Sequence, residues 1–557
     1  MSETVPVSVL VGQTLAGLGV GHVFGVVGSG NFDVVNALRS AGVPFTAARH
    51  EGGAATMADA YARMSNRVGV VSTHQGCGLT NAVTGIGEAA KSRTPLIVLT
   101  ADTQGAAVRS NFKIDQDALA RSVGAVAERV HSAESAAADT VRAFRTALNE
   151  RRTVVLSLPL DVQKEQAPVP GESVQLPAPA RLRPNSAGVE QLVDLLRGAA
   201  RPVFVAGRGG RGARDEILAL AEHCGALVAT SAVANGLFNG EAFSLGISGG
   251  FSSPVTADLI SGADLIVGWG CTLNMWTMRH GRLISPDAKV VQIDVEDASL
   301  GANRPISLGV LGDAALTAQD ALELLKKVQP AAAQKYRSPE NALILKSSSW
   351  RDVRTPDLST PALIDPRVLS RELDALLPAE RIVSVDSGNF MGYPSQYLAV
   401  PDEFGFCFTQ AFQAVGLGLS TAIGAAIAQP QRLPVLGAGD GGFLMGISEL
   451  ETAVRLGLPL VCIVYNDAAY GAEVHHFGHG TENTDLGSVT FPDTDIAAIA
   501  RGFGAEAVTV RTVEDLQSVK AWIAAYEKGI QDRPLVIDAK IASDGGSWWL
   551  AEAFQGH

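Results

Sequence analysis

A chain of 557 residues, 46% hydrophobic and only 18% charged, is long enough for about three to four domains with much buried surface. Its net charge of −13 argues against nucleic acid and anionic membranes as partners, and no apolar run reaches the about 18 residues of a membrane-spanning helix. The five cysteines show neither metal-binding spacing nor a disulfide framework, and the start of the chain has no signal-like segment, so we expect a cytoplasmic protein.

The first predicted block, residues 1–165, alternates helical patterns with apolar runs, of which residues 68–72 and 95–100 are the clearest. Such alternation predicts parallel strands joined by crossover helices. Loops at the carboxyl ends of parallel strands form the ligand crevice of such sheets. Polar residues follow predicted strands at three places in this block: Ser29, Glu51, and the pair His74 and Gln75.

Each of these places also has a purely structural interpretation. Ser29 lies in a glycine-containing turn that could simply lead into a helix. Glu51 precedes a helix of small residues and could simply complement the positive end of that helix, an effect of about 0.3–1 kcal/mol. A lone loop histidine such as His74 is often structural, but histidine is also the side chain best suited to acid–base work near neutral pH.

A proline-containing stretch, residues 166–185, predicts an extended linker to a second α/β block at residues 186–328. A strand is predicted in this block at residues 289–294. The glycine-rich turn at residues 207–212 could approach phosphate groups, although such turns also occur without a ligand. A polar, proline-containing segment from about residue 329 to 366 predicts a second linker.

The third block, residues 366–545, carries the most informative pattern of the chain. Gly439-Asp440-Gly441 is followed after 24 residues by Asn466, and the intervening residues predict an amphipathic helix and then a buried parallel strand. An acid at one strand end and an amide at the next suit a hard cation with oxygen ligands, such as Mg²⁺. Because Mg²⁺ shares its shell with phosphate, and because glycines allow close backbone approach, the pattern predicts a bound diphosphate.

A second backbone cradle in this block consists of Gly388, Asn389 and Phe390, which follow a predicted strand at residues 381–385. Alone, such a turn is usually only a turn. Two loops at the carboxyl edge of one sheet could hold a diphosphate from both sides. The block is followed by an aromatic tail, residues 546–557, which either covers a cleft or packs on the surface.

The Gly-Asp-Gly…Asn pattern resembles the motif of thiamine diphosphate (ThDP) enzymes, and residues 49–63 resemble the glutamate segment of the same enzymes. The resemblance covers nearly the whole chain, in the domain order of the acetolactate synthase, benzoylformate decarboxylase and pyruvate decarboxylase superfamily. It implies three α/β domains with parallel sheets (pyrimidine-binding, central Rossmann-like and diphosphate-binding) and the cofactors ThDP and Mg²⁺. In this superfamily the pyrimidine domain of one subunit meets the diphosphate domain of another, which implies an obligatory homodimer, and tetramers are usual.

The resemblance assigns the cofactor site residue by residue. Asp440 and Asn466 would bind Mg²⁺ through their side chains, and Ala468 would bind it through its carbonyl. The family often has two asparagines and then a glycine at residues 466–468, where this chain has Asn-Asp-Ala. The cofactor-binding residues that it implies are Gly388, Asn389, Phe390, Gln413, Val415, Gly439, Gly441, Gly442 and Tyr470.

Two of the implied roles concern the pyrimidine ring. Glu51 would hydrogen-bond the ring and thereby form the 4′-imino group that activates the reactive carbon of the cofactor. Glu51 and Asp440 should then meet across a subunit interface. Val415 would wedge the cofactor into its bent shape, with the carbonyl of Gln413 facing the 4′-amino group. As a small apolar residue, Val415 could equally belong to the core.

The residues implied to face the substrate lie in three segments. His74 stands, with Gln75 beside it, where benzoylformate decarboxylase-like enzymes have a proton-relaying histidine. Glu473 matches a glutamate of pyruvate decarboxylases that helps decarboxylation and protonates the resulting enamine. Ala472 falls at a position often filled by a larger side chain, which indicates room for a longer substrate or acceptor. Ser29 lies in a loop that faces the substrate in relatives.

Two adjacent histidines, His475 and His476, follow Glu473. They could be interpreted as a pair of metal ligands. Adjacent side chains point in different directions on a helix or a strand, however. We therefore expect these histidines to form a polar rim of the active site, with catalytic roles, and not a second metal site.

The reaction implied by the resemblance starts from a 2-oxo acid donor. After CO₂ leaves, an enamine is either protonated to an aldehyde or trapped by a carbonyl acceptor in an acyloin-forming carboligation. We expect an acetolactate synthase-like carboligase, although the chain lacks the Gly-Pro-Gly-Ala loop of those synthases. The alternatives are a simple 2-oxo acid decarboxylase, an FAD-dependent oxidoreductase of the pyruvate oxidase type, and a non-catalytic ThDP-binding subunit. FAD would bind the central block at residues 207–212, and we favour a site without it.

Overall fold

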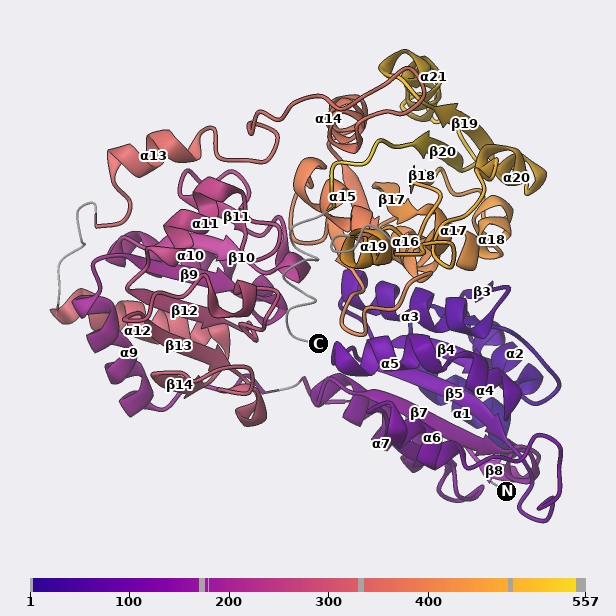
Figure 1. Ribbon diagram of the computed structural model, residues 1–557. Helices are drawn as coiled ribbons and strands as arrows, with labels where there is room; N and C mark the ends of the chain where they lie inside the picture. Colours follow the sequence, from indigo (N-terminus) through magenta and orange to yellow (C-terminus); the bar gives the residue numbers. More distant parts are fainter. Residues whose placement is uncertain (1–3, 170–175, 179, 329–334, 479–483, 547–557) are drawn as a thin grey trace.

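The computed structural model describes residues 4–169, 176–178, 180–328, 335–478 and 484–546. Within these residues the chain forms three α/β domains, each built on a six-stranded parallel sheet, which confirms the predicted fold class (Figure 1). The inner strands are fully or nearly fully buried apolar runs, as β7 shows over Thr153–Pro159, because helices cover both faces of each sheet, whereas edge strands such as β6 (Val126–Arg129) and β19 (Glu506–Val510) are partly exposed. No helix in the described part of the chain combines the length and apolarity that a bilayer crossing requires.

The pyrimidine domain has the strand order β3-β2-β4-β5-β7-β6. A short antiparallel pair of β1 (Thr4–Pro6) and β8 (Gln166–Pro168) closes its base, so the predicted linker begins with a strand. The other elements are β2 (Val23–Gly25), β3 (Phe45–Ala47), β4 (Gly69–Thr73), β5 (Leu96–Asp102), β6 (Val126–Arg129) and β7, with α1 (Val7–Gly17), α2 (Phe32–Ser40), α3 (Glu51–Ser65), α4 (Cys77–Asn81), α5 (Val83–Lys91), α6 (Gln116–Ser122), α7 (Ala136–Asn149) and α8 (Leu160–Gln163).

The central domain has the order β11-β10-β9-β12-β13-β14, which is the 3-2-1-4-5-6 order of a Rossmann sheet. The segment that follows it, predicted as a linker, contains a helix, α13, capped by Ser338 and started by a proline. The elements are β9 (Pro202–Ala206), β10 (Leu227–Thr230), β11 (Ser244–Ile247), β12 (Leu265–Trp269), β13 (Lys289–Asp294) and β14 (Leu308–Leu311), with α9 (Ser186–Gly198), α10 (Arg214–Cys224), α11 (Pro254–Ser261), α12 (Ala314–Val328) and α13 (Pro339–Leu345).

The diphosphate domain has the order β16-β15-β17-β18-β20-β19, the same order by sequence as in the pyrimidine domain. Its elements are β15 (Arg381–Val385), β16 (Phe406–Phe408), β17 (Leu433–Gly439), β18 (Val461–Asn466), β19 (Glu506–Val510) and β20 (Leu535–Lys540), with α14 (Pro366–Leu376), α15 (Gly392–Tyr397), α16 (Gly418–Ala428), α17 (Asp440–Met445), α18 (Glu449–Arg455), α19 (Gly471–Phe477), α20 (Ile496–Gly502) and α21 (Gln517–Tyr526).

The single amphipathic helix predicted between Gly441 and the next strand is wrong. The residues after Asp440 form two helices, α17 and α18, with a break at Gly446. A Cβ at Gly446 would lie 2.7 Å from the carbonyl oxygen of Gly416, so the break brings two loops into close contact. Glycine is also a poor helix former, which favours the interruption at this point. The predicted aromatic tail lies, from residue 547 on, outside the described residues.

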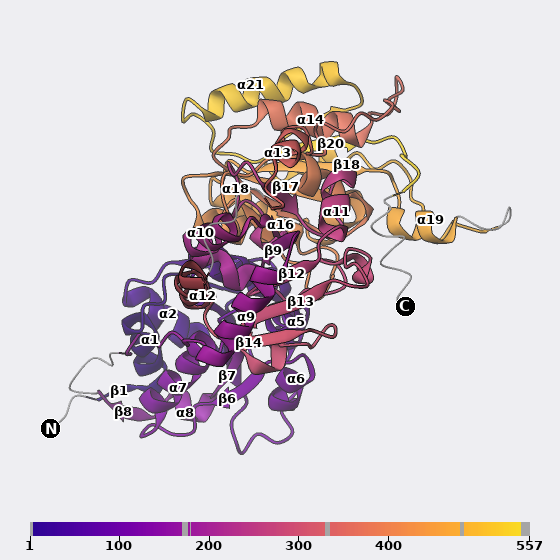
Figure 2. The same cartoon turned by 90° about the vertical axis from the view of Figure 1, so that its left-hand side faces the viewer.

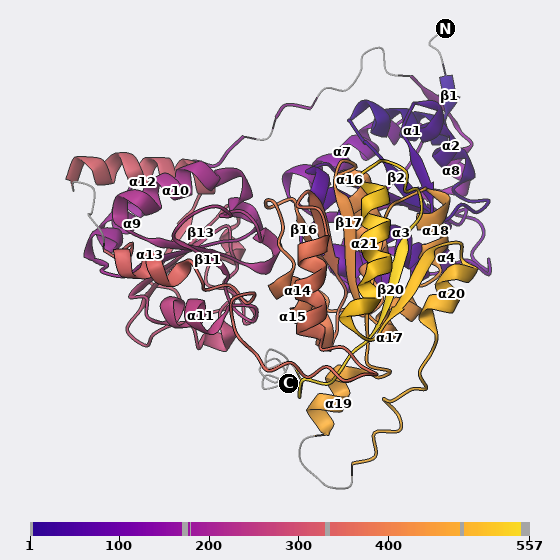
Figure 3. The ribbon, with the colours of Figure 1, turned by 90° about the horizontal axis from the view of Figure 1, so that it is seen from above.

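The pyrimidine and diphosphate domains share one hydrophobic core. Helices α3 and α16 pack against each other, and Met57 and Ile423 belong to the same buried cluster. Gly424 permits this packing, since a Cβ there would clash with the carbonyl of Met57. Figure 2 shows the pyrimidine domain below the diphosphate domain, and Figure 3 shows the central domain beside both, with α14 and α15 between the central and diphosphate sheets.

Candidate active site

A cavity of about 620 Å³ lies where the central and diphosphate domains face each other. The diphosphate domain contributes the loops that follow β15, β17 and β18, all at the carboxyl edge of its sheet. Crevices of open parallel sheets occur at this edge. The lining includes all nine residues predicted to bind the cofactor. Of the three predicted metal ligands, Asp440 lines the cavity, whereas Asn466 and Ala468 are not among the described residues that do.

Asp440 and Asn466, two of the predicted metal ligands, lie at the carboxyl ends of the neighbouring strands β17 and β18. Gly439 of β17 pairs with Tyr465 of β18, so that the next residues, Asp440 and Asn466, emerge side by side. Both side chains are buried, at 7% and 4% exposure. The amide nitrogen of Asn466 donates a hydrogen bond to Asp538 at 2.8 Å, which fixes the orientation of the amide. The structure thus brings together the carboxylate and the amide that the sequence spacing predicts.

Ala468 adopts the left-handed backbone conformation, with φ of +54°, and its N–H donates to the amide oxygen of Asn466. A residue with a Cβ pays roughly 1–2 kcal/mol for this conformation. Glycine would adopt it without strain, which explains why a glycine is usual at this position of the resembled motif. The turn nevertheless forms with alanine at this position.

Asp467 is a further acid in this site that the sequence motif did not single out. It lines the cavity and shares a hydrogen bond with Asp440, and burial together with the charge of Asp440 raises the pKa of Asp467 to about 7. Burial also raises the pKa of Asp440. Two buried carboxylates in contact repel each other when both are ionised. A divalent cation would relieve this repulsion, so the donor set of carboxylates, an amide and a carbonyl fits Mg²⁺.

Glycines form the cradle around these acids. A Cβ at Gly442 would clash with the Asp386 carboxylate, and a Cβ at Gly441 would lie 2.8 Å from the ring of Tyr470. Gly388 has a φ of +150°, which residues with side chains rarely adopt. These three glycines line the cavity and carry no side chain, which suits the close backbone approach of a diphosphate.

Asp386 connects the cradle to the turn that carries Val415. Its carboxylate accepts hydrogen bonds from the N–H groups of Ser387 at 2.8 Å and Gly416 at 3.0 Å. Burial raises the pKa of Asp386 to about 6. Gln413 and Gly416 both have positive φ values, of +58° and +90°, so the chain reverses sharply around Val415.

Val415 does not belong to the core. Its side chain is 43% exposed and lines the cavity together with Gln413. Tyr470, Ala472 and Glu473, from the start of α19, also line the cavity. His475 and His476 lie further along α19 and are not among the described residues that line it, and a Cβ at Gly546 would lie within 3 Å of the His475 ring.

A second cluster of predicted residues lies in the pyrimidine domain. Glu51 is the first residue of α3, and its carboxylate accepts a hydrogen bond from Asn81 at 3.0 Å. A Cβ at Gly78 would lie 3.3 Å from this carboxylate and 3.1 Å from the Cβ of His74, so that Glu51 and His74 flank the same glycine. The hydroxyl of Ser29 lies 3.5 Å from Nε2 of His74.

Gln75 completes this cluster from a buried position. Its side chain is 3% exposed and fits against Gly30, where any Cβ would clash with it. Among the described residues that line the cavity, none is Ser29, Glu51, His74 or Gln75. The residues predicted for one active site therefore occupy two separate regions of this chain.

The cavity extends into the central domain as a basic lobe. Its lining includes Arg93, Arg151 and Arg208, and Gly207 and Gly209 lie so close to Gly270 that no side chain would fit. Burial and the neighbouring arginines lower the pKa of Arg208 to about 9. This lobe is not evident from the sequence, since its charges come from two domains.

Three family models match the chain in succession. The N-terminal TPP binding domain of thiamine pyrophosphate (ThDP) enzymes matches residues 7–120, the central domain of these enzymes matches residues 189–321, and their C-terminal TPP binding domain matches residues 386–539.

Relatives of similar length carry three different names. A sulfoacetaldehyde acetyltransferase of Alcaligenes xylosoxydans xylosoxydans is 30% identical over 90% of this chain and 88% of its own length. A probable 2-ketoarginine decarboxylase of Pseudomonas aeruginosa is 29% identical over 91% and 89%, and an acetolactate synthase large subunit of Parasynechococcus marenigrum is 28% identical over 88% and 81%. With these matches over all three domains, the chain belongs to the family of thiamine pyrophosphate enzymes.

Proposed function

We propose that this protein is a ThDP- and Mg²⁺-dependent 2-oxo acid decarboxylating carboligase, similar to acetolactate synthase, that joins the donor to a carbonyl acceptor. The observation that carries the proposal is the cavity at the carboxyl edge of the diphosphate sheet, where Asp440 and Asp467 stand beside a glycine cradle. Ala472, at the cavity wall, leaves room for an acceptor. Relatives named as acetyltransferase, decarboxylase and synthase agree with chemistry at a carbonyl carbon.

In this proposal the cofactor is held mainly by the diphosphate domain. Asp440, Asn466 and the carbonyl of Ala468 bind Mg²⁺, and the glycines at 388, 439, 441 and 442 accommodate the diphosphate. Val415 and the carbonyl of Gln413 shape the wall beside the pyrimidine ring. When bound, ThDP supplies a nucleophilic carbon and a sink for the electrons that decarboxylation releases.

The chain's own residues handle the protons of the reaction. Glu51 holds a proton at its carboxyl group for exchange with the pyrimidine ring. Glu473 lines the cavity and can deliver a proton to the reacting carbon or withhold it. His74, with Ser29 near its Nε2, is a second group that can relay protons. If protonation outruns capture by an acceptor, the same site acts as a simple decarboxylase, which is the alternative that this histidine favours.

We further propose that the site is completed by a second copy of the chain. Glu51 and His74 lie outside the cavity of their own chain, so that a homodimer would supply them to the cavity of the partner. A dimer is thus obligatory for activity in this account, and a tetramer is a dimer of such dimers. The basic lobe suits an anionic nucleotide such as FAD. An FAD-dependent oxidoreductase would be yellow, so a colourless active enzyme excludes this alternative.

The test is a panel of 2-oxo acids incubated with the purified protein, ThDP and Mg²⁺, with and without aldehyde acceptors. Products are identified by mass. We expect CO₂ release with all accepted donors and a carboligation product only when an acceptor is present. Turnover that yields aldehyde alone in all cases would assign a decarboxylase, and no turnover with any donor would contradict the proposal. Glu51→Gln is the matched inactive control.

A further inference from the structure

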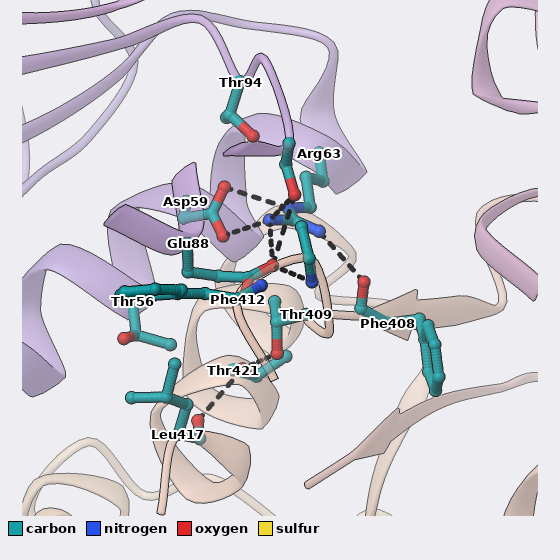
Figure 4. A network of polar contacts seen from close by, with 12 residues as sticks. Thr56, Asp59, Arg63, Glu88, Thr94, Phe408, Thr409, Phe412, Leu417 and Thr421 are labelled. Atoms are coloured by element: carbon teal, nitrogen blue, oxygen red, sulfur yellow. Dashed lines mark hydrogen bonds and ion pairs between the residues drawn. The ribbon is translucent and has the colours of Figure 1, made fainter. Parts of the chain in front are cut away.

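A buried ionic network joins the pyrimidine domain to the turn that carries Gln413 and Val415. It consists of Asp59 and Arg63 on α3 and Glu88 on α5, which are 0%, 6% and 0% exposed (Figure 4). Arg63 donates to Asp59 at 2.6 Å and to Glu88 at 2.8 Å. Its remaining nitrogen donates to the backbone carbonyl of Phe408, at the end of β16, at 2.9 Å.

Glu88 binds the turn directly. Its two carboxylate oxygens accept hydrogen bonds from consecutive backbone N–H groups, those of Ala411 at 3.0 Å and Phe412 at 2.6 Å. Hydrogen bonds to a charged group in a dry interior are stronger than neutral ones. Two such bonds to adjacent N–H groups fix the direction in which the chain enters the turn.

The same helix, α5, also holds the ring of Phe412. A Cβ at Gly87 would lie 2.8 Å from this ring, so the glycine provides the space that the ring occupies. The ammonium group of Lys91 lies 5.2 Å from the ring centroid on another side. Helix α5 thus contacts Phe412 in two ways: Glu88 binds its backbone, and Gly87 and Lys91 lie against its ring. These contacts hold the ring although Phe412 is 41% exposed.

From the other side, the turn is held by Asp386 of the diphosphate domain, which accepts from Gly416. Between these two anchors lie only residues 413–415, with the positive φ of Gln413. A short segment held at both ends has few conformations left, and a displacement of the first anchor therefore moves Val415.

We infer that Glu88, supported by Arg63 and Asp59, is a positioning residue that sets the turn at 411–416 against the pyrimidine side of the bound cofactor. The inference rests on the proposed function for the identity of the ligand. In this arrangement helix α3 serves two regions, with Glu51 at its first residue and the Arg63 network near its end. Glu88 touches neither substrate nor cofactor, and it acts through the backbone of Ala411 and Phe412.

The test compares Glu88→Gln with Asp374→Asn in the full-length protein. Asp374 is a matched control, because its carboxylate also bridges an arginine, Arg381 at 2.6 Å, and a backbone N–H, that of Ala399 at 2.8 Å, but away from the turn. Two readouts are measured: hydrogen exchange of the 411–416 amides in the protein without cofactor, and the Kd for ThDP with Mg²⁺.

For Glu88→Gln we expect hydrogen exchange of the turn amides to be at least about 10-fold faster than in the wild type. We also expect the Kd for ThDP to rise about 10- to 100-fold, as loss of charged hydrogen bonds predicts. For Asp374→Asn both should stay within about 2-fold of wild type, even if its melting temperature falls by the same amount. Equal behaviour of the two variants would overturn the inference. Failure of the wild-type protein to bind ThDP would instead contradict the proposed function, while the exchange readout would still decide the role of Glu88.

A second variant covers the case in which Glu88→Gln does not fold. Gly87→Ala keeps every charge and suits a helix better, but its methyl group displaces the Phe412 ring. We expect faster exchange in the turn and a Kd raised about 3- to 10-fold, with a native melting temperature. Unchanged exchange and Kd in this variant would overturn the inference as well.

Discussion

The pyrimidine and diphosphate domains have the same strand order, but they use the carboxyl edge of the sheet for different chemistry. In the diphosphate domain the edge carries oxygen ligands, glycine loops and a cavity. In the pyrimidine domain it carries an acid and a histidine around Gly78, outside that cavity. Equivalent loops lie in the two domains. The loop after β3 leads to Glu51 at the start of α3, and the loop after β16 carries Val415 and leads to α16.

This comparison teaches that one fold repeated in one chain can supply two complementary halves of a site. Because α3 and α16 pack against each other within the chain, the two edges are fixed by a shared core. Neither half is a complete active site in our account. The variants below affect one half at a time, and their effects should differ in kind as well as in size.

The largest effect should come from Glu51→Gln, which changes the pyrimidine half alone. We expect a loss of kcat of about 10³- to 10⁴-fold, the upper range for a lost acid–base group. The melting temperature should change little, because Glu51 bonds only to Asn81 in the described structure. Steady-state kinetics on the best 2-oxo acid donor, together with thermal melts, measure both, and an active variant would refute the role of Glu51.

The next effect should come from Asp440→Ala, which changes the diphosphate half. We expect the Kd for ThDP with Mg²⁺ to rise at least about 100-fold, since loss of groups that merely support metal ligands costs 10- to 100-fold. In contrast to Glu51→Gln, this variant should be impaired in binding and not only in turnover. Isothermal titration with ThDP at several Mg²⁺ concentrations would show it, and a wild-type Kd would contradict the assignment.

A pH-dependent effect should come from Asp386→Asn. The pKa of Asp386 is raised to about 6 from 3.8, so the native state keeps a proton between about pH 4 and 6 that the unfolded state has lost. The stability of the wild type therefore falls as pH rises through this window, whereas the variant has no such loss. From pH 4.5 to 7.5 we expect the variant to gain on the order of 2 kcal/mol relative to wild type in urea unfolding. A pH-independent difference would contradict the raised pKa.

The smallest effect should come from Val415→Ala. Since this side chain is 43% exposed, we expect little change in stability and about a 10-fold lower kcat from looser positioning of the cofactor. The matched control is Val383→Ala in β15, which is fully buried and should lose about 1–3 kcal/mol of stability with kcat nearly unchanged. Reversed outcomes would place Val415 in the core.

Much of the cofactor half could be predicted because its signals are local. Asp440 and Asn466 each end an apolar strand, and adjacent parallel strands align their ends. The separation of Glu51 from the cavity could not be predicted from spacing, since it depends on how α3 packs on α16. The resemblance alone indicated it.

Other features depend on contacts that no sequence pattern encodes. Asp467 stood out only as a departure from a motif, and its raised pKa arises from burial next to Asp440. Asp59, Arg63 and Glu88 are charged residues in helices with many small residues. Their pairing with one another and their hydrogen bonds to the backbone of residues 408–412 explain their burial. The break at Gly446 follows from a contact with the distant Gly416.

The central claim is that one site combines Glu51 of one chain with Asp440 of another, and complementation tests it most directly. Glu51→Gln and Asp440→Ala proteins, each inactive alone, are unfolded, mixed in equal amounts and refolded together. Random pairing makes half of the dimers mixed, and each mixed dimer has one intact site, so about a quarter of wild-type activity should return. If the mixture stays as inactive as the two separate variants, the two residues act within one chain and the account is wrong.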